Sequence, residues 1–325
     1  MADSVQRAVL TGIGGYLPET VVTNDEMSRR VDTSDQWIVE RTGIRQRHFA
    51  AAHESASFMG ASAARAALAM AGLPAESVGA IILATSTPDQ AFPATAVHVQ
   101  AALGAVNAFA FDLAAACSGF IYGLSVADAM IRAGQVQHVL VIGAEVYSRI
   151  LDFSDRGTCV LFGDGAGAVL LSSRHVSVDG PGVLSTHLHA DGRLADILYV
   201  DGAVGRPEAS GFLRMNGREV FRHAVTLLAA AVSEALAANN LTAQDVDWLV
   251  PHQANRRIID GVGRKLGLPP DRVVVTVDAH ANTSAASIPL ALAQAMADGR
   301  IKPGALVLLE ALGGGLTWGS ALLRI

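Results

Sequence analysis

The chain has only two cysteines, Cys117 and Cys159, among its 325 residues. Two thiols can form neither a framework of several disulfides nor a zinc site built from cysteine alone. Charged residues are also scarce, at 17% of the chain, where soluble domains usually carry about 25%. The net charge of −6 provides no general attraction for nucleic acid. We therefore expect neither a nucleic-acid partner nor a cysteine-based metal centre.

The chain also lacks a segment that reads as a signal sequence or a membrane span. The N-terminal segment carries Asp3 and Arg7 and has no apolar core of signal-peptide length. Residues 90–111 contain no Asp, Glu, Lys or Arg, but polar residues, Pro93 and Gly104 interrupt them. That pattern favours a buried helix over a membrane span. We expect a cytoplasmic protein that does not enter a membrane.

What the chain has in abundance is apolar residues, at 51%, which excludes intrinsic disorder. It also contains an internal repeat, the feature to look for first. Five segments recur in the same order: 75–87 with 243–255, 111–120 with 277–286, 128–134 with 294–299, 138–145 with 305–312 and 163–171 with 315–323. This alignment places Cys117 over Thr283 and Gly167 over Gly319.

The repeated unit alternates short apolar strands with helices of small residues, such as residues 57–72 and 221–240. Such alternation predicts an α/β fold, and the duplication predicts two similar sheets packed through shared helices. No linker rich in Pro, Gly or Ser separates the halves, and their boundary falls near residues 172–179. We expect halves at 1–172 and 173–325, packed as one body.

Two further patterns look like ligand sites and are set aside. Gly12 and Gly14 follow a strand, as in a dinucleotide-binding loop, but Leu17 stands where the third glycine belongs. His187 and His189 share one face of a predicted strand, yet no third metal ligand is near them in sequence. We predict no nucleotide cofactor at the first and a surface strand at the second.

The strongest chemical signal lies at Cys117, where an apolar strand gives way to a helix of small residues. Unpaired N–H groups and the dipole at a helix N-terminus stabilise a thiolate. Buried free cysteines are also common as small apolar residues, so both readings stay open for Cys117, whereas Cys159 fits the core. Loops around His252 and Asn282 end corresponding strands of the second half and could meet Cys117 in one pocket.

Together with the motifs that surround these residues, the sequence from Leu10 to Ile325 resembles the β-ketoacyl-[acyl-carrier-protein] synthase III family of the thiolase superfamily. The most specific stretches are DTSDQWIVERTGIRQRH (32–48), LAAACSGF (113–120), DRGTCVLFGDGAGAVLL (155–171), VPHQANRRI (250–258), NTSAASIP (282–289) and LLEALGGGLTWGSALL (308–323). The resemblance implies a five-layer αβαβα thiolase-like fold and a homodimer. It also implies a catalytic triad of Cys117, His252 and Asn282.

The reaction implied by this resemblance starts fatty acid biosynthesis, with acetyl-CoA as the expected starter. An acyl group passes from coenzyme A to Cys117, and malonyl-[acyl-carrier protein] then loses carbon dioxide and attacks the thioester. His252 and Asn282 would donate to the malonyl thioester oxygen, and the backbone N–H groups of Cys117 and Gly314 to the acyl oxyanion. No metal or cofactor is implied beyond the coenzyme A thioester. The alternative is a starter-unit ketosynthase or acyltransferase of secondary metabolism with the same triad.

The resemblance also implies the substrate contacts. The residues carried over to coenzyme A are Trp37, Arg156, Thr33, Arg41 and Asn255. Those carried over to carrier-protein docking are Arg257, Arg264, Lys265 and Arg222, for which a solvated helix face is the alternative. Phe92 would reach from one subunit to close the acyl pocket of the other. Ala281 stands where the family usually has glycine, so a positive φ there would strain the Asn282 loop.

Overall fold

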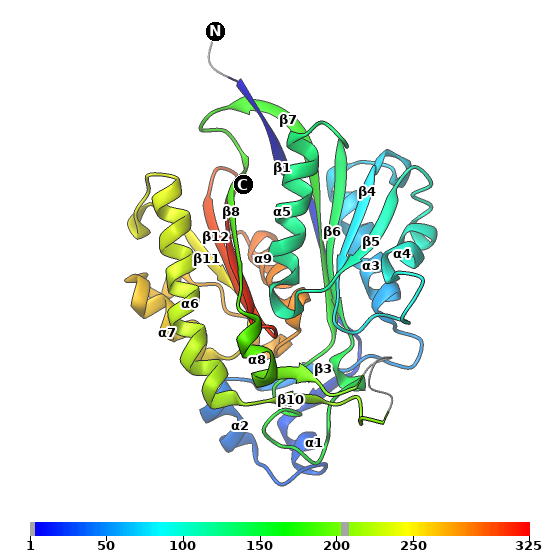
Figure 1. Ribbon diagram of the computed structural model, residues 1–325, viewed down its shortest axis with the longest axis vertical. Helices are drawn as coiled ribbons and strands as arrows, with labels where there is room; N and C mark the ends of the chain where they lie inside the picture. The colour runs from blue at the N-terminus through cyan, green and yellow to red at the C-terminus, as the bar shows by residue number, and fades with distance from the viewer. Residues whose placement is uncertain (1–3, 203–207) are drawn as a thin grey trace.

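A computed structural model describes residues 4–202 and 208–325, and they form two sheets flanked and separated by helices (Figure 1). The first sheet has the order β1 (Ser4–Tyr16), β7 (Gly165–Ser177), β6 (His138–Glu145), β4 (Ala80–Ala84), β5 (Phe109–Leu113). The second has the order β11 (Trp248–Pro251), β12 (Leu306–Gly313), β13 (Thr317–Arg324), β8 (Gly182–Ala190). Two smaller pairs are β2 (Val21–Thr23) with β3 (Gln46–His48), and β9 (Leu198–Val200) with β10 (Leu213–Met215).

The helices form three layers around these sheets, which confirms the predicted αβαβα arrangement (Figure 1). The outer layer on the first sheet holds α3 (Ala56–Ala71) and α4 (Thr95–Leu103). The middle layer holds α5 (Gly119–Arg132) and α9 (Ser287–Ala297). The outer layer on the second sheet holds α6 (Gly217–Ala238) and α7 (Arg256–Leu266).

Shorter helical segments connect the layers. The α-helical ones are α1 (Asn24–Ser28), α2 (Asp35–Thr42) and α8 (Val277–His280). The 3₁₀ segments are η1 (Ala75–Ser77), η2 (Ala116–Ser118), η3 (Tyr147–Arg149), η4 (Gly192–Ile197), η5 (Ala243–Asp245), η6 (Pro270–Arg272) and η7 (Ser284–Ala286).

The strand pairings confirm the internal repeat and correct its register. Each half contains an equivalent parallel pair, β4 with β6 in the first and β11 with β12 in the second, with Ala80 opposite Val139 and Trp248 opposite Val307. The sequence alignment of residues 138–145 with 305–312 is therefore wrong by one residue.

The alignment around the nucleophile is wrong by two residues. In the first half η2 precedes α5 and starts with Ala116 at a φ of 44°, and in the second half η7 precedes α9 and starts with Ser284 at a φ of 49°. The structural counterpart of Cys117 is consequently Ala285 rather than Thr283. The offset between the halves does not drift, but changes in one step where residues 146–164 replace the short turn 314–316.

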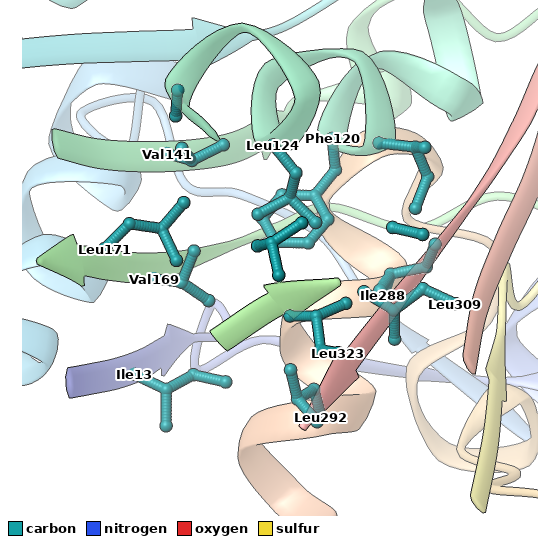
Figure 2. Packing of buried hydrophobic residues seen from close by; sticks show 14 of the residues in the cluster. Ile13, Phe120, Leu124, Val141, Val169, Leu171, Ile288, Leu292, Leu309 and Leu323 are labelled. Carbon is teal, nitrogen blue, oxygen red and sulfur yellow. The ribbon is translucent and has the colours of Figure 1, made fainter. Parts of the chain in front are cut away.

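The middle layer forms the main hydrophobic core. Figure 2 shows Phe120 and Leu124 of α5 facing Ile288 and Leu292 of α9 across the space between the sheets. The strands contribute buried side chains from both sheets, among them Ile13, Val141, Val169, Leu171, Leu309 and Leu323. Burying each large apolar side chain stabilises the fold by about 1.5–3 kcal/mol, so this layer holds the two halves together as one body.

Two local expectations need correction. Residues 90–111 do not form one helix, because α4 ends at Gly104, which adopts a φ of 71°, and the chain then enters β5. The glycines at 12 and 14 lie within the long strand β1, where an added Cβ would come 2.1 Å and 2.3 Å from carbonyl oxygens of α3. Their function is close packing of a helix on a strand. The turn between the two sheets lies at residues 178–181, next to the boundary predicted near residues 172–179.

Among the described residues, α6 is the helix long and apolar enough to cross a membrane by length and composition alone. A core helix of a soluble protein passes the same test. Here α6 packs along the second sheet with Val220, Leu228 and Val232 buried in its interface.

Gly143 of β6 generates the first testable prediction. A Cβ at this position would lie 2.2 Å from the Ala285 carbonyl oxygen and 2.9 Å from the Ala286 nitrogen, both backbone atoms that have little freedom to move. We expect Gly143→Ala to lower the free energy of unfolding by about 1–3 kcal/mol or more, measured by urea denaturation. Gly192→Ala is the matched control, because no atom lies within 4 Å of its added Cβ. Equal stability of the two variants would contradict this packing.

Candidate active site

A cavity of about 560 Å³ is lined by residues of both halves, and all three predicted catalytic side chains reach it. Cys117 comes from the turn before α5, His252 from the end of β11, and Asn282 from the turn before η7. The structure therefore brings together three residues that are separated by at least 30 positions in sequence. We expected this convergence because their loops follow corresponding strands of the two halves.

Cys117 is held in a close-packed turn. The residue before it, Ala116, has a φ of 44°, in the left-handed region that residues with a Cβ rarely adopt. The hydroxyl of Ser118 forms a 2.8 Å hydrogen bond with that of Thr317 and ties the turn to β13. A Cβ on Gly313 would lie 2.6 Å from the Cys117 nitrogen, so the glycine segment passes directly against the nucleophile's backbone.

The predicted second oxyanion donor, Gly314, lies in the same glycine segment that touches the Cys117 turn. A Cβ at Gly314 would come 2.6 Å from the Leu198 carbonyl oxygen, so only glycine fits between β12 and β9. This placement agrees with a backbone donor close to Cys117.

Burial raises the pKa of the Cys117 thiol to about 12, and its side chain is 4% exposed. The helix N-terminus was expected to stabilise the thiolate, but burial outweighs the nearby N–H groups in this structure. The resting residue is therefore a neutral thiol, which would have to lose its proton before or during any reaction as a nucleophile.

His252 is buried and neutral. Burial lowers the pKa of its imidazole to about 3. Its Nδ1 forms a 2.7 Å hydrogen bond with the Ser287 hydroxyl, which also accepts a hydrogen bond from the Gln253 backbone N–H. We assign the Ser287 hydroxyl as the donor to Nδ1, because its oxygen already accepts the Gln253 N–H, and this assignment places the proton of the neutral ring on Nε2. This tautomer makes His252 a hydrogen-bond donor toward the cavity.

Asn282 is fixed by its own backbone and by the following turn. Its N–H donates to the Leu161 carbonyl and its carbonyl accepts from the Gly163 N–H, both at 3.0 Å. Its side-chain Oδ1 accepts from the Ser284 N–H at 2.9 Å, which leaves the Nδ2 group available as a donor. Ala281 has a φ of 57° and a ψ of −160°, so alanine occupies the strained conformation that glycine adopts without cost.

Trp37, Arg41 and Arg156 meet at the outer part of the cavity. The guanidinium carbons lie 4.8 Å and 5.1 Å from the centre of the indole ring, respectively. Arg156 also donates to the Asp32 carbonyl at 3.0 Å. An aromatic base between indole and guanidinium would need two contacts of about 3.5 Å each. The Arg156 guanidinium therefore leaves no room on this face of the indole ring, and it must move away before an aromatic base can stack there.

The other predicted coenzyme A residues are placed differently. Asn255 lines the cavity and caps α7, because its side-chain oxygen accepts from the Ile258 N–H at 3.0 Å. Thr33 does not line the cavity, and its buried hydroxyl has no hydrogen-bond partner within the described part of the chain. Asn255 thus has a structural function that is independent of any ligand.

The predicted docking residues lie beside the cavity on α6 and α7. Arg257, Arg264 and Lys265 are exposed and form no ion pair with any described residue. Arg222 differs, because its guanidinium pairs with Glu219 at 2.5 Å. The surface of α7 therefore carries unneutralised positive charge, and Arg257 also forms part of the cavity wall.

Phe92 lies in the loop before α4, does not line the cavity of its own chain, and is 84% exposed. Val97 of α4, Val106 of the following loop and Phe109 of the edge strand β5 are exposed as well. Exposed large apolar side chains that lie together are typical of an interface.

The two histidines of β8 share one face of the strand, as predicted, and both contact Glu234 of α6. The distances are 3.3 Å from His187 and 2.6 Å from His189. Nevertheless, no group of three His, Cys, Asp or Glu side chains within residues 4–202 and 208–325 is arranged to hold a metal ion.

Sequence reasoning missed the residues that hold the triad in place. Ser287 sets the tautomer of His252, and Ser284 orients the Asn282 amide. Both lie in the motif NTSAASIP, but small polar residues are frequent throughout this chain. Ser284 and Ser287 differ from the other serines only in their position in η7 and directly after it, which the sequence does not reveal.

Comparisons with known proteins relate the chain to one family. Residues 111–192 match the family described as 3-oxoacyl-[acyl-carrier-protein] synthase III, and residues 236–325 match its C-terminal family. A protein of Acidiphilium cryptum named beta-ketoacyl-[acyl-carrier-protein] synthase III is 70% identical over 98% of this chain and 100% of its own. The protein of the same name from Granulibacter bethesdensis is 64% identical over 99% of this chain and 100% of its own.

Solved structures extend the comparison to the fold. The 3-oxoacyl-[acyl-carrier-protein] synthase III of Aquifex aeolicus has a TM-score of 0.93 and 46% identity, covering 98% of this chain and 100% of its own. A priming β-ketosynthase of the R1128 polyketide pathway has a TM-score of 0.92 at 36% identity, covering 98% and 96%.

The lowered pKa of His252 predicts a loss of stability in acid. An unfolded histidine, with a pKa of 6.5, takes up a proton below that pH, whereas the folded one stays neutral down to about 3. Stability from this residue is therefore lost as pH falls from 6.5 toward 3, by about 2 kcal/mol at pH 5. We expect the parent's advantage in unfolding free energy over His252→Asn to be smaller by that amount at pH 5 than at pH 7.5, in urea denaturation. An unchanged difference would contradict the assignment of a neutral, buried imidazole.

Proposed function

The chain belongs to the 3-oxoacyl-[acyl-carrier-protein] synthase III family, and we propose that Cys117, His252 and Asn282 carry out its reaction. The protein is an acyltransferase that condenses an acyl-CoA starter with malonyl-[acyl-carrier protein], releasing coenzyme A and carbon dioxide, and so begins fatty acid synthesis. The observation that carries the residue assignment is the convergence of these three side chains on one cavity.

In the first step, the Cys117 sulfur attacks the thioester carbonyl of the starter and displaces the coenzyme A sulfur. The tetrahedral intermediate carries negative charge on oxygen. We assign its stabilisation to the backbone N–H groups of Cys117 and Gly314, because the glycine segment lies against the nucleophile's turn.

In the second step, malonyl-[acyl-carrier protein] loses carbon dioxide, and its α-carbon attacks the acyl-Cys117 thioester. Decarboxylation transfers charge to the malonyl thioester oxygen. His252 Nε2 and Asn282 Nδ2 supply two neutral hydrogen-bond donors for that oxygen, because Ser287 and the Ser284 N–H occupy the other polar atoms of these side chains. A neutral imidazole suits this function, since its pKa lies far below neutrality.

The alternative of a starter-unit enzyme of secondary metabolism is not favoured. Eight relatives named beta-ketoacyl-[acyl-carrier-protein] synthase III are 57–70% identical to this chain over at least 98% of its length, which favours the enzyme of fatty acid synthesis. We assign acetyl-CoA as the starter from the family resemblance.

For coenzyme A, we propose that Trp37 and Arg156 hold the adenine after Arg156 swings off the indole ring. Both faces of the adenine would then be stacked, one by an indole and one by a guanidinium. Arg41 and Asn255 line the same cavity as Cys117. Thr33 lies two residues before α2, the helix that carries Trp37.

For the carrier protein, we propose docking on α7. Arg257, Arg264 and Lys265 give this face a positive charge on a chain whose net charge is −6, and Arg222 extends it onto α6. Such a local patch attracts an acidic helical partner specifically, without attracting nucleic acid in general. Arg257 joins the patch to the cavity, so that a substrate on the carrier can reach Cys117.

We further propose a cytoplasmic homodimer in which Phe92 closes the partner's acyl pocket. The exposed apolar surface along α4 and β5 supports an interface between two copies. The triad and the backbone donors account for the charge that develops in both steps, so we propose no metal or organic cofactor.

The first experiment tests the nucleophile. We expect Cys117→Ser to abolish acyl-enzyme formation from acetyl-CoA, because a serine alkoxide is far less accessible than a thiolate at neutral pH. Intact-protein mass spectrometry measures the acyl adduct. Cys159→Ser is the matched control, since this second buried cysteine does not reach the cavity and should acylate like the parent. A stable acyl adduct on Cys117→Ser would disprove the assignment.

The second experiment separates the two steps. Removing one preorganised oxyanion donor typically slows a reaction by roughly 10²–10³. We expect His252→Ala and Asn282→Ala to accept labelled acyl groups from acyl-CoA onto Cys117, yet to condense at least tens of times more slowly. The measurement is label on the protein against ketoacyl product. If acylation falls in proportion to condensation, His252 is a general base and the division of labour is wrong.

A further inference from the structure

Three buried polar side chains lie against Cys117 without lining the cavity. Glu145 ends β6, Tyr147 follows it in η3, and Ser284 begins η7. All three are less than 9% exposed, and each influences or contacts the Cys117 thiol. The sulfur therefore lies between the substrate cavity and a buried polar cluster that the proposed mechanism does not use.

The Glu145 carboxyl is half satisfied. Its Oε2 accepts from the Ser86 N–H at 3.0 Å, from the Thr87 hydroxyl at 2.7 Å and from the Thr85 hydroxyl at 3.3 Å. Its Oε1 has no hydrogen-bond partner among the described residues, although the side chain is fully buried. An unsatisfied carboxyl oxygen is costly in a core and indicates a function.

Ser284 stands between this carboxyl and the thiol. Its hydroxyl lies close enough to act on the ionisation of both Glu145 and Cys117, and, like Oε1, it is buried and makes no hydrogen bond in the described chain. The close contact between Gly143 and Ala285 sets this spacing, because it presses β6 against η7 two residues before Glu145. Ser284 itself is held at a φ of 49°, a conformation that costs free energy and aims the hydroxyl.

The thiol needs a proton acceptor that His252 does not supply. Burial raises the pKa of Cys117 to about 12 and lowers that of His252 to about 3, so the imidazole is a very weak base. Burial also raises the pKa of Glu145 to about 7, so its carboxylate is available near neutrality and binds a proton more strongly. Tyr147 does not compete with Glu145 for the Cys117 proton, because burial raises the pKa of its phenol well above the usual value and the phenol keeps its own proton.

We propose that Glu145, acting through the Ser284 hydroxyl, holds the Cys117 proton for the lifetime of the acyl-enzyme. This inference rests on the proposed acylation of Cys117. As the sulfur bonds to the acyl carbon, its proton passes to the Ser284 oxygen, and the Ser284 proton passes to Oε1 of Glu145. The carbon–sulfur bond to coenzyme A breaks, and the departing thiolate takes a proton from solvent.

The condensation step returns the proton. Loss of carbon dioxide leaves an electron pair on the malonyl α-carbon, which forms the new carbon–carbon bond as the bond to Cys117 sulfur breaks. The Cys117 thiolate regains its proton from Glu145 through Ser284. The cycle consumes one solvent proton, taken up by coenzyme A, and restores the resting thiol. Glu145 is a positioning residue in this scheme, because it touches neither substrate.

The experiment follows single-turnover acylation by labelled acetyl-CoA between pH 5.5 and 9. In the parent we expect the rate to rise with pH through ionisation of Glu145 and then level off. Glu145→Gln should lose this rise and acylate about 10² times more slowly at pH 8, the usual range for loss of a general base. The acetyl-CoA concentration for half-maximal rate should not change, because the carboxyl does not line the cavity.

Three further variants make the result specific. Ser284→Ala should show the same loss, and the double variant should be no slower than either single one, because both act on one proton route. Glu145→Asp, which keeps a carboxylate, should recover part of the rate and the pH dependence. Glu310→Gln is the matched control: Glu310 is equally buried, with its pKa raised to about 8, but it makes no contact with Cys117, and its variant should keep the parent's profile.

A parent-like rate and pH profile in Glu145→Gln would overturn the proposal, as would additive losses in the double variant. If Glu145→Gln fails to fold, the rate and pH profile of Ser284→Ala test the proposal instead. This variant keeps the backbone N–H of residue 284 that donates to Asn282 Oδ1. Failure of the proposed function is distinct, since the parent and Glu310→Gln would then show no label on Cys117 at all.

Discussion

The site depends on the absence of side chains where the turns of the two halves meet. An added Cβ would collide with backbone at Gly143, where β6 passes η7, and at Gly313, where β12 passes the Cys117 nitrogen. At Gly119, the first residue of α5, it would lie 2.9 Å from the Ala84 Cβ. These contacts bring the starts of the two central helices together, and each helix carries part of the triad at its start. Core packing and catalytic geometry are therefore set by the same glycines.

Burial then determines the protonation of the whole site. It leaves Cys117 as a thiol, His252 as a neutral donor and Glu145 close to its midpoint at neutral pH. A site made only of neutral or near-neutral groups does not need counter-ions, and it gains most from charge that appears during the reaction. The fixed charge lies outside the buried site, on α7 and around Trp37, which are the surfaces that we propose for substrate recognition.

The sequence predicted the α/β class, the internal repeat and the convergence of Cys117 with His252 and Asn282, because strand periodicity and repeat order are local properties. The sequence alignment of the two halves placed the counterpart of Cys117 two residues too early, at Thr283 instead of Ala285. Similarity between small residues is too weak to align two halves correctly without knowledge of the strand pairing. The raised pKa of the thiol and the importance of Ser284 and Ser287 were not predictable, because burial and turn geometry arise only from tertiary packing. Trp37 was found, but the resting position of Arg156 on its ring depends on a flexible side chain.

The two halves differ where residues 146–164 of the first replace the short turn 314–316 of the second, and this difference affects the symmetry of the site. A perfectly symmetric duplication would build two equivalent clefts per chain, one over each central helix start. Residues 146–164 break the symmetry, because Leu161 and Gly163 pair with the backbone of Asn282. The equivalent turn 314–316 has three residues. Since Ala285 stands where the first half has Cys117, the pseudo-symmetric chain presents a single thiol-bearing turn for each polypeptide.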